Sequence, residues 1–200
     1  MTSHANRASA PLARSSYDDS AARLAEAARL LLAHLEHGRR VDTAMLRAAM
    51  EQAFGASDAS GAWTWKTGYD ACEAAAVMFL RKYGKAILRK AGTPAAALPT
   101  LAKIANLLPT HTRRSEESQA FQQLSTPLPL GLAALTAAAI VPGDSVLEPS
   151  AGTGLLAVLA DISGSTLILN ELAVNRAGLL PQLFPEISVT RFDAAQIDDH

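Results

Sequence analysis

The sequence predicts an α/β protein in which an all-helical region precedes a short parallel sheet. Alanine-rich segments with a helical spacing of apolar residues fill the first half of the chain. After residue 121, short apolar strands alternate with helices, which is typical of a parallel sheet with right-handed crossovers. The chain has 200 residues, of which 49% are hydrophobic. This is enough for one or two domains with a sizeable core.

The helical region is expected at residues 17–115, after a disordered tail at residues 1–16. Asp18 and Asp19 can cap a first helix, which ends near Gly38. Further helices are predicted at residues 42–55, 69–90 and 94–108. The polar, proline-led segment 109–118 is interpreted as a linker.

The sheet region is expected at residues 116–200. A helix should begin near Ser125-Thr126-Pro127, because proline is favoured at the first helical position, and run to about residue 140. Strands are predicted at residues 145–148, 166–170 and 187–192, with helices at 155–161 and 173–180 between them. Glu148, Glu171 and Asp193 end or follow these strands. The carboxyl ends of parallel strands meet at one edge, where ligands bind.

Charge and cysteine content limit the possible functions. The net charge is −1, but residues 1–120 carry 16 basic and 11 acidic residues, whereas residues 121–200 carry 2 and 8. The basic helical half is compatible with an anionic partner such as DNA, although a solvated face is the more common meaning of such charges. The single cysteine, Cys72, excludes an internal disulfide and fits a reducing cytoplasm. No apolar run is long enough to span a membrane.

Smaller motifs in the helical half allow two interpretations. Trp63 and Trp65 lie beside Lys66 and can stack on bases, but packing within a helical module is the more common role. The Arg113-Arg114 pair can contact phosphate or lie in a solvated linker. The histidines show no metal-ligand spacing.

The most informative segment, residues 146–154, is an apolar strand followed by a glycine-rich loop and an apolar helix. One interpretation is a dinucleotide site, since Gly152-x-Gly154-x-x-Ala157 fits the looser dinucleotide pattern and Glu171 lies near the expected distance for a ribose acid. A tight strand–helix turn without a ligand is the simplest alternative.

S-adenosylmethionine is the other ligand that this loop suits. It has no phosphates, and it needs close approach of the backbone, an acid for the ribose hydroxyls and an acceptor for the adenine amine. Glu171 and Asp193 can supply the last two. Glu148 would oppose a pyrophosphate, but it can face the methionine ammonium, directly or through water.

These residues resemble the motifs of class I S-adenosylmethionine-dependent methyltransferases, above all those that modify the adenine amino group in DNA. The segment EPSAGTG resembles motif I, residues 121–127 resemble the segment before it, and Glu171 and Asp193 match the acids of motifs II and III. The resemblance implies an incomplete Rossmann-like sheet that binds S-adenosyl-L-methionine. The implied cofactor-binding residues are Thr126, Pro127, Glu148, Pro149, Ser150, Ala151, Gly152, Thr153, Gly154, Glu171, Leu172, Asp193 and Ala194.

Residues 69–91, the FQQLSTPLPL segment and the last residues resemble the amino-terminal region of strawberry notch-type proteins of bacteria, plasmids and phages. Those chains continue into a helicase domain, so the resemblance implies that a downstream helicase region or a separate chain completes the sheet.

The chain departs from the methyltransferase pattern at two points. Leu172-Ala173 stand where the family usually has an acid and a proline, and the Asn/Asp-Pro-Pro-aromatic motif that holds the flipped adenine is absent. We therefore expect a methyltransferase domain truncated after its third strand, with no catalytic residue, weak cofactor binding at most and no turnover alone. The alternative is a non-catalytic DNA- or protein-binding module of a mobile-element or anti-restriction protein.

Overall fold

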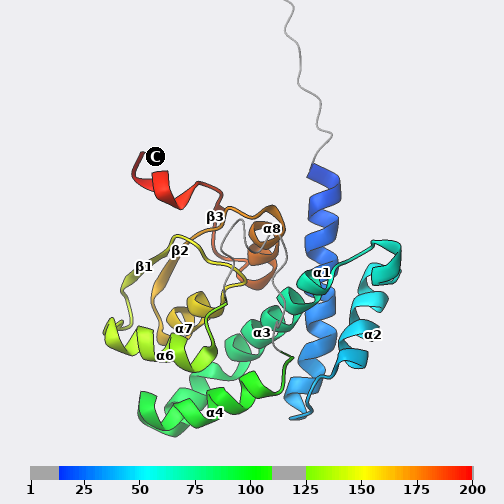
Figure 1. The fold of residues 1–200 in the computed structure, drawn as a ribbon. Helices are drawn as coiled ribbons and strands as arrows, with labels where there is room; N and C mark the ends of the chain where they lie inside the picture. Colours follow the sequence, from blue (N-terminus) through cyan, green and yellow to red (C-terminus); the bar gives the residue numbers. More distant parts are fainter. Residues whose placement is uncertain (1–13, 110–124, 200) are drawn as a thin grey trace, which may run out of the picture.

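The computed structural model describes residues 14–109 and 125–199. It is a mixed α/β protein, mostly helical, with a small parallel sheet (Figure 1). The helical half contains α1 (Arg14–Glu36), α2 (Thr43–Phe54), the short 3-10 helix η1 (Asp58–Ser60), α3 (Trp65–Ala91) and α4 (Pro94–Asn106). Most of the predicted tail and linker, including Arg113-Arg114, and residues 121–124 lie outside the described residues.

The sheet half follows the predicted alternation. Its elements are α6 (Leu128–Ala137), β1 (Ser145–Glu148), α7 (Leu155–Ser163), β2 (Thr166–Asn170), α8 (Val174–Leu183), β3 (Val189–Thr190) and the 3-10 segment η2 (Ala194–Asp199). The strands lie in the order β1-β2-β3 and are all parallel. The predicted bounds of the first two strands are confirmed, whereas the third is much shorter than residues 187–192.

Side-chain caps define where the helices of the first half begin. Asp42 accepts a hydrogen bond from the Met45 amide (2.8 Å) at the start of α2, and Thr93 accepts one from the Ala96 amide (3.2 Å) at the start of α4. Thr64 does the same for α3, which explains why that helix begins four residues before the predicted position.

The predicted cap at Asp18 and Asp19 is wrong. Helix α1 begins at Arg14, so both residues lie inside it. Asp19 instead forms an ion pair with Arg23 (2.8 Å), one helical turn further along. An acid four residues before a basic residue stabilises the interior of a helix, and an acid is also common at a helix start. The sequence alone does not show which of these two roles Asp19 has.

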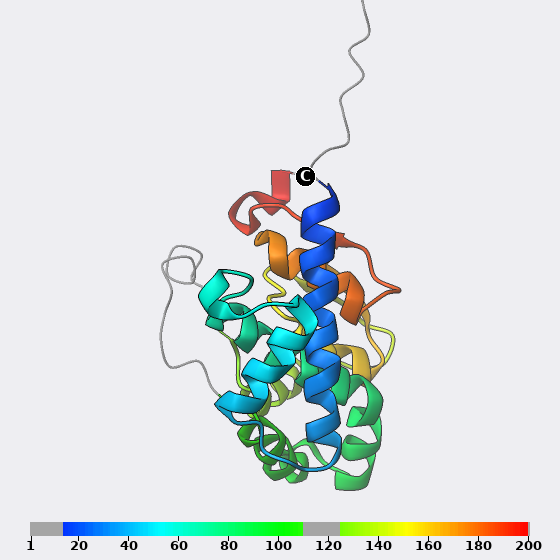
Figure 2. The ribbon, with the colours of Figure 1, turned by 90° about the vertical axis from the view of Figure 1, so that its right-hand side faces the viewer.

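One hydrophobic core joins the helical half to the sheet half. Helix α3 packs against α1 on one side and against α7 on the other, α1 also packs against α8, and α4 packs against α6. Figure 1 shows α3 running between the sheet and the α1–α2 pair. Figure 2 shows α1 extending over nearly the full height of the described fold, with α2 beside it. The helical half therefore packs directly against the helices that cover the sheet.

Two glycines allow the helices to approach α7 closely. A Cβ at Gly84 of α3 would lie 2.7 Å from Ile162 Cδ1, and a Cβ at Gly131 of α6 would lie 2.8 Å from Leu159 Cδ1. Neither distance leaves room for a larger side chain without movement of α7.

The sheet is covered on one face. Leu167 and Leu169 of β2 are buried against the helices, whereas Leu147 of β1 and its register partner Ile168 are each 51% exposed. Parallel sheets usually have both faces covered. In the part of the chain that the structure describes, the face that carries Leu147 and Ile168 remains open to solvent.

The close packing of α3 on α7 gives a stability prediction. Replacing Gly84 with valine should lower the free energy of unfolding by about 1–3 kcal/mol, because the new side chain overlaps Ile162. The exposed Ala86→Val on the same helix is the matched control and should cost less than about 1 kcal/mol through helix propensity alone. Urea unfolding measures both, and equal losses in the two variants would contradict the packing described.

Candidate functional site

The glycine loop after β1 is shaped by two residues with positive φ. Gly152 has φ 57° and Gly154 has φ 89°, both in the left-handed region that favours glycine. A Cβ at Gly154 would also lie 2.6 Å from the Phe184 ring, so glycine is required there for space as well. The loop passes from the end of β1 directly into α7.

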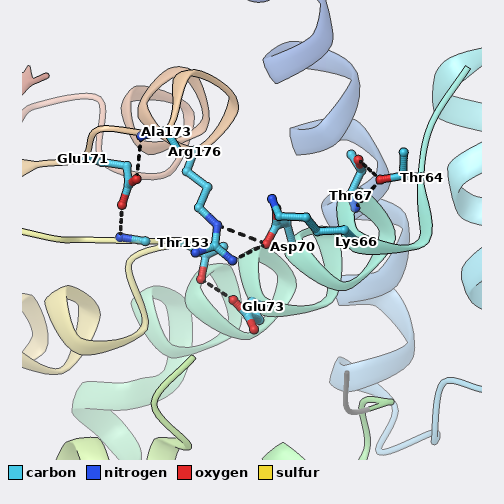
Figure 3. A network of polar contacts seen from close by, with 10 residues as sticks. Thr64, Lys66, Thr67, Asp70, Glu73, Thr153, Glu171, Ala173 and Arg176 are labelled. Carbon is cyan, nitrogen blue, oxygen red and sulfur yellow. Dashed lines mark hydrogen bonds and ion pairs between the residues drawn. The ribbon is translucent and has the colours of Figure 1, made fainter. Parts of the chain in front are cut away.

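Glu171, the predicted ribose acid, holds this loop in place. Its two carboxylate oxygens accept hydrogen bonds from the Gly152 amide (2.7 Å) and from the Ala173 amide (2.8 Å), and the residue is only 7% exposed. Figure 3 shows the carboxylate between the loop and the start of α8. Each oxygen keeps a further lone pair, so the loop contact leaves acceptor capacity for a ligand.

Asn170, the residue before Glu171, ties together the ends of all three strands. It is 1% exposed, and its Nδ2 donates to the Pro149 and Phe192 carbonyls, each at 2.9 Å. Its Oδ1 accepts from the Phe192 amide (2.8 Å). The sequence analysis placed Asn170 at the end of the second strand and gave it no further role. The sequence alone does not distinguish a buried asparagine from one in an exposed turn.

A small, half-open cleft lies beside the loop. It is lined by Ser125, Thr126, Glu148, Ser150, Ala151, Gly152, Thr153, Leu155, Leu156 and Arg176. Its volume of about 40 Å³ is the space of roughly three water molecules, so the cleft suits one end of a ligand and not a whole nucleoside.

The structure brings most of the predicted motif I residues to this cleft. Thr126, Glu148 and residues 150–153 line it. The remaining predicted residues, Pro127, Pro149, Gly154, Glu171, Leu172, Asp193 and Ala194, do not. Pro127 precedes α6, Gly154 precedes α7, and Leu172 is 40% exposed.

Asp193 lies apart from the cleft and has a local role. Its carboxylate accepts a hydrogen bond from the Ala195 amide (3.0 Å), and its carbonyl accepts one from the Gln196 amide (2.9 Å). These bonds form the turn into η2, and the side chain is exposed. In this structure Asp193 therefore shapes the chain after β3.

Helix α3 contributes polar groups to the site that sequence reasoning missed. Asp70 accepts hydrogen bonds from Nε (3.2 Å) and Nη2 (2.8 Å) of Arg176 on α8. Glu73, one turn further along α3, accepts a hydrogen bond from the Thr153 hydroxyl (2.7 Å) of the glycine loop. Figure 3 shows both acids on the side of α3 that faces the loop. The available signal was two acids one turn apart in the alanine-rich first half of α3, most of which is buried.

Burial and neighbouring acids change the acid–base properties of this network. Burial raises the pKa of Glu73, and the charge of Asp70 raises it further. Hydrogen bonds from Ser125 and Thr153 lower it, but by less. Burial also raises the pKa of Glu148. Burial alone would lower the pKa of Arg176, but the contact with Asp70 and the charges of Glu73 and Glu171 together outweigh burial, and the pKa is raised. Among the described residues, the carboxyl groups of Asp70, Glu73, Glu148 and Glu171 thus lie near two cations, Arg176 and Lys66.

Comparison with protein-family models, with curated proteins and with solved structures gives no match for this chain. Within residues 14–109 and 125–199, no group of three or more His, Cys, Asp or Glu residues is placed to hold a metal ion. The same residues contain no helix that is both long and apolar enough to cross a membrane.

The raised pKa of Glu73 gives a pH prediction. Below its ordinary value of 4.5, Glu73 is protonated in both folded and unfolded chains. As the pH rises from there through the raised pKa of the folded state, the unfolded chain gives up the proton first and the folded state loses stability. Glu73→Gln cannot ionise, so its stability relative to the wild type should increase across this window.

Thermal or urea unfolding between about pH 4 and pH 8 measures this difference. Glu26→Gln, which removes an exposed carboxylate of α1, is the control. A stability difference between Glu73→Gln and the wild type that does not change with pH would show that Glu73 is not shifted.

Proposed function

We propose that this chain is the S-adenosylmethionine-binding part of a Rossmann-like, class I methyltransferase. The observation that carries the proposal is the glycine loop between β1 and α7, which is hydrogen-bonded through Gly152 to the acid that follows β2, with Glu148 at the end of β1 lining the same cleft. This places a close-approach backbone and two acids at the carboxyl ends of adjacent parallel strands, where ligands of such sheets bind.

The charge of the site favours S-adenosylmethionine over a dinucleotide. Glu73, Glu148 and Glu171 lie on or beside the glycine loop, and Arg176 is the one cation among the described residues that line the cleft. A pyrophosphate would bring two negative charges next to these carboxylates, whereas S-adenosylmethionine, with a sulfonium, an ammonium and one carboxylate, carries a net charge of +1. Like charges in a partly buried site disfavour each other, so the cationic ligand is the better fit.

The proposed reaction of the complete assembly is methyl transfer to an adenine amino group in DNA, a substrate suggested by the sequence resemblance. Such transfer depends chiefly on aligning donor and amine. No residue of this chain is assigned to the target base. The open sheet face with Leu147 and Ile168 offers a surface that a helicase-type region or a separate chain can cover, and such a partner would also supply the residues for the target base.

Ligand titration tests the cofactor site. S-adenosylhomocysteine should bind the wild-type chain, and Glu171→Ala should weaken binding by at least about tenfold, since it removes the proposed ribose acceptor and frees the Gly152 amide. Glu26→Gln is the control for removal of an acid outside the site. Calorimetry that detects no heat at millimolar ligand with folded protein, or that detects binding of NAD instead, would overturn the proposal.

A second candidate function is non-catalytic DNA binding by the helical half. Lys85 and Arg89 are exposed and lie one turn apart on α3, and Arg39 and Arg40 are exposed after α1. Within the described residues no ion pair involves any of these four side chains. Exposed Lys and Arg side chains bind DNA by neutralising its phosphates.

A gel shift at several salt concentrations tests this second function. Lys85→Gln with Arg89→Gln should weaken DNA binding and reduce the salt slope by about one for each phosphate that the variant no longer neutralises. Arg23→Gln with Arg29→Gln removes the same charge from side chains already paired with Asp19 and Glu26, so it should have a smaller effect. The absence of any shift at low salt would exclude the nucleic-acid version.

A further inference from the structure

Arg176 has hydrogen-bonding capacity that the fold does not use. The residue lies in the first turn of α8, is 6% exposed and lines the cleft. Its Nε and Nη2 donate to Asp70, which fixes one edge of the guanidinium. No described residue accepts a hydrogen bond from Nη1. A Cβ at Gly152 would lie 3.8 Å from Nη1, so this nitrogen faces the glycine loop.

The start of α7 lies at the same cleft. Leu155 and Leu156 are its first two residues and both line the cleft. Their amides precede the first intrahelical hydrogen bond, which runs from the Val158 amide to the Gly154 carbonyl. Amides at a helix start carry partial positive charge and favour an anion. Together with Nη1 of Arg176, they give the cleft an anion-binding side.

Glu148 gives the same cleft a cation-binding group. The residue lines the cleft, and its carboxylate accepts one long hydrogen bond, from the Ser150 amide at 3.3 Å. The cleft thus combines a carboxylate with a guanidinium and a helix start. An α-amino acid group, with its ammonium and its carboxylate on one carbon, matches this combination. It also matches the small volume of the cleft, which a nucleoside would exceed.

We propose that Arg176 is a specificity-determining residue that binds the α-carboxylate of the amino-acid end of the ligand, while Glu148 faces its ammonium. The inference rests on the proposed function, since it specifies how S-adenosylmethionine or S-adenosylhomocysteine is oriented. Asp70 acts as a positioning residue, because its bonds to Nε and Nη2 direct Nη1 away from α3. Glycine at 152 leaves the space next to Nη1 free of a side chain.

The inference predicts a preference that depends on a single chemical group. S-adenosylhomocysteine and its decarboxylated analogue share the adenosyl group, the thioether and the amine, and they differ only in the carboxylate. The wild-type chain should bind S-adenosylhomocysteine about tenfold to a hundredfold more tightly than the analogue, as expected for a charge-assisted hydrogen bond. Calorimetric titration with both compounds measures this ratio.

Variants assign the preference to Arg176. Arg176→Gln should lower the affinity for S-adenosylhomocysteine by the same factor, leave the affinity for the analogue nearly unchanged and so abolish the preference. Arg176→Lys should keep part of it, since the charge remains without the planar fork. Arg81→Gln is the matched control, because Arg81 also joins α3 to other elements, through Asp161 and the Leu183 carbonyl, but lies outside the cleft.

The possible outcomes separate the role of Arg176 from cofactor binding itself. Equal affinity of the wild type for both compounds, or a preference that persists in Arg176→Gln, would overturn the role of Arg176 and leave cofactor binding intact. Failure of the wild type to bind either compound would overturn both. If circular dichroism shows that Arg176→Gln does not fold, the wild-type ratio and Arg176→Lys decide the question.

Discussion

The ion pair between Asp70 of α3 and Arg176 of α8 is the interaction on which the arrangement of the site depends. The two side chains are 5% and 8% exposed, and the closest nitrogen–oxygen distance is 2.8 Å. Removing one partner of such a pair leaves the other charge buried, at a cost of about 3–5 kcal/mol. The pair therefore fixes the start of α8 against α3, although the two residues are 106 positions apart in the chain.

The position of the glycine loop follows from this attachment. Glu171, which lies just before α8, accepts the Gly152 amide, and Glu73, one turn from Asp70, accepts the Thr153 hydroxyl. The loop is thus held from the sheet side and from the helical side at adjacent residues. A loop that is already ordered loses less conformational entropy when a ligand binds. The helical half is therefore part of the site as well as its support.

Local patterns predicted the elements that local interactions determine. The bounds of β1 and β2 follow from short apolar runs between turn residues, and Asp42 and Thr93 start their helices through bonds to amides three residues away. The glycine loop and Glu148 were found for the same reason. Asp70 and Glu73 could not be assigned to the site, because their partners lie far away in the sequence. Asp193 was assigned from its place after the third strand and its match to the motif III acid; in the structure β3 is short and the Asp193 side chain bonds within the turn into η2.

Hydrogen–deuterium exchange of the Asp70→Asn variant tests most directly whether α3 holds the site together. Its side chain is isosteric but uncharged, so the contact with Arg176 weakens without a change in volume. The amides of Gly152, Thr153 and Ala173 should then exchange faster than in the wild type, although none of them is on α3. Faster exchange confined to α3, with the loop and the start of α8 unchanged, would contradict the account.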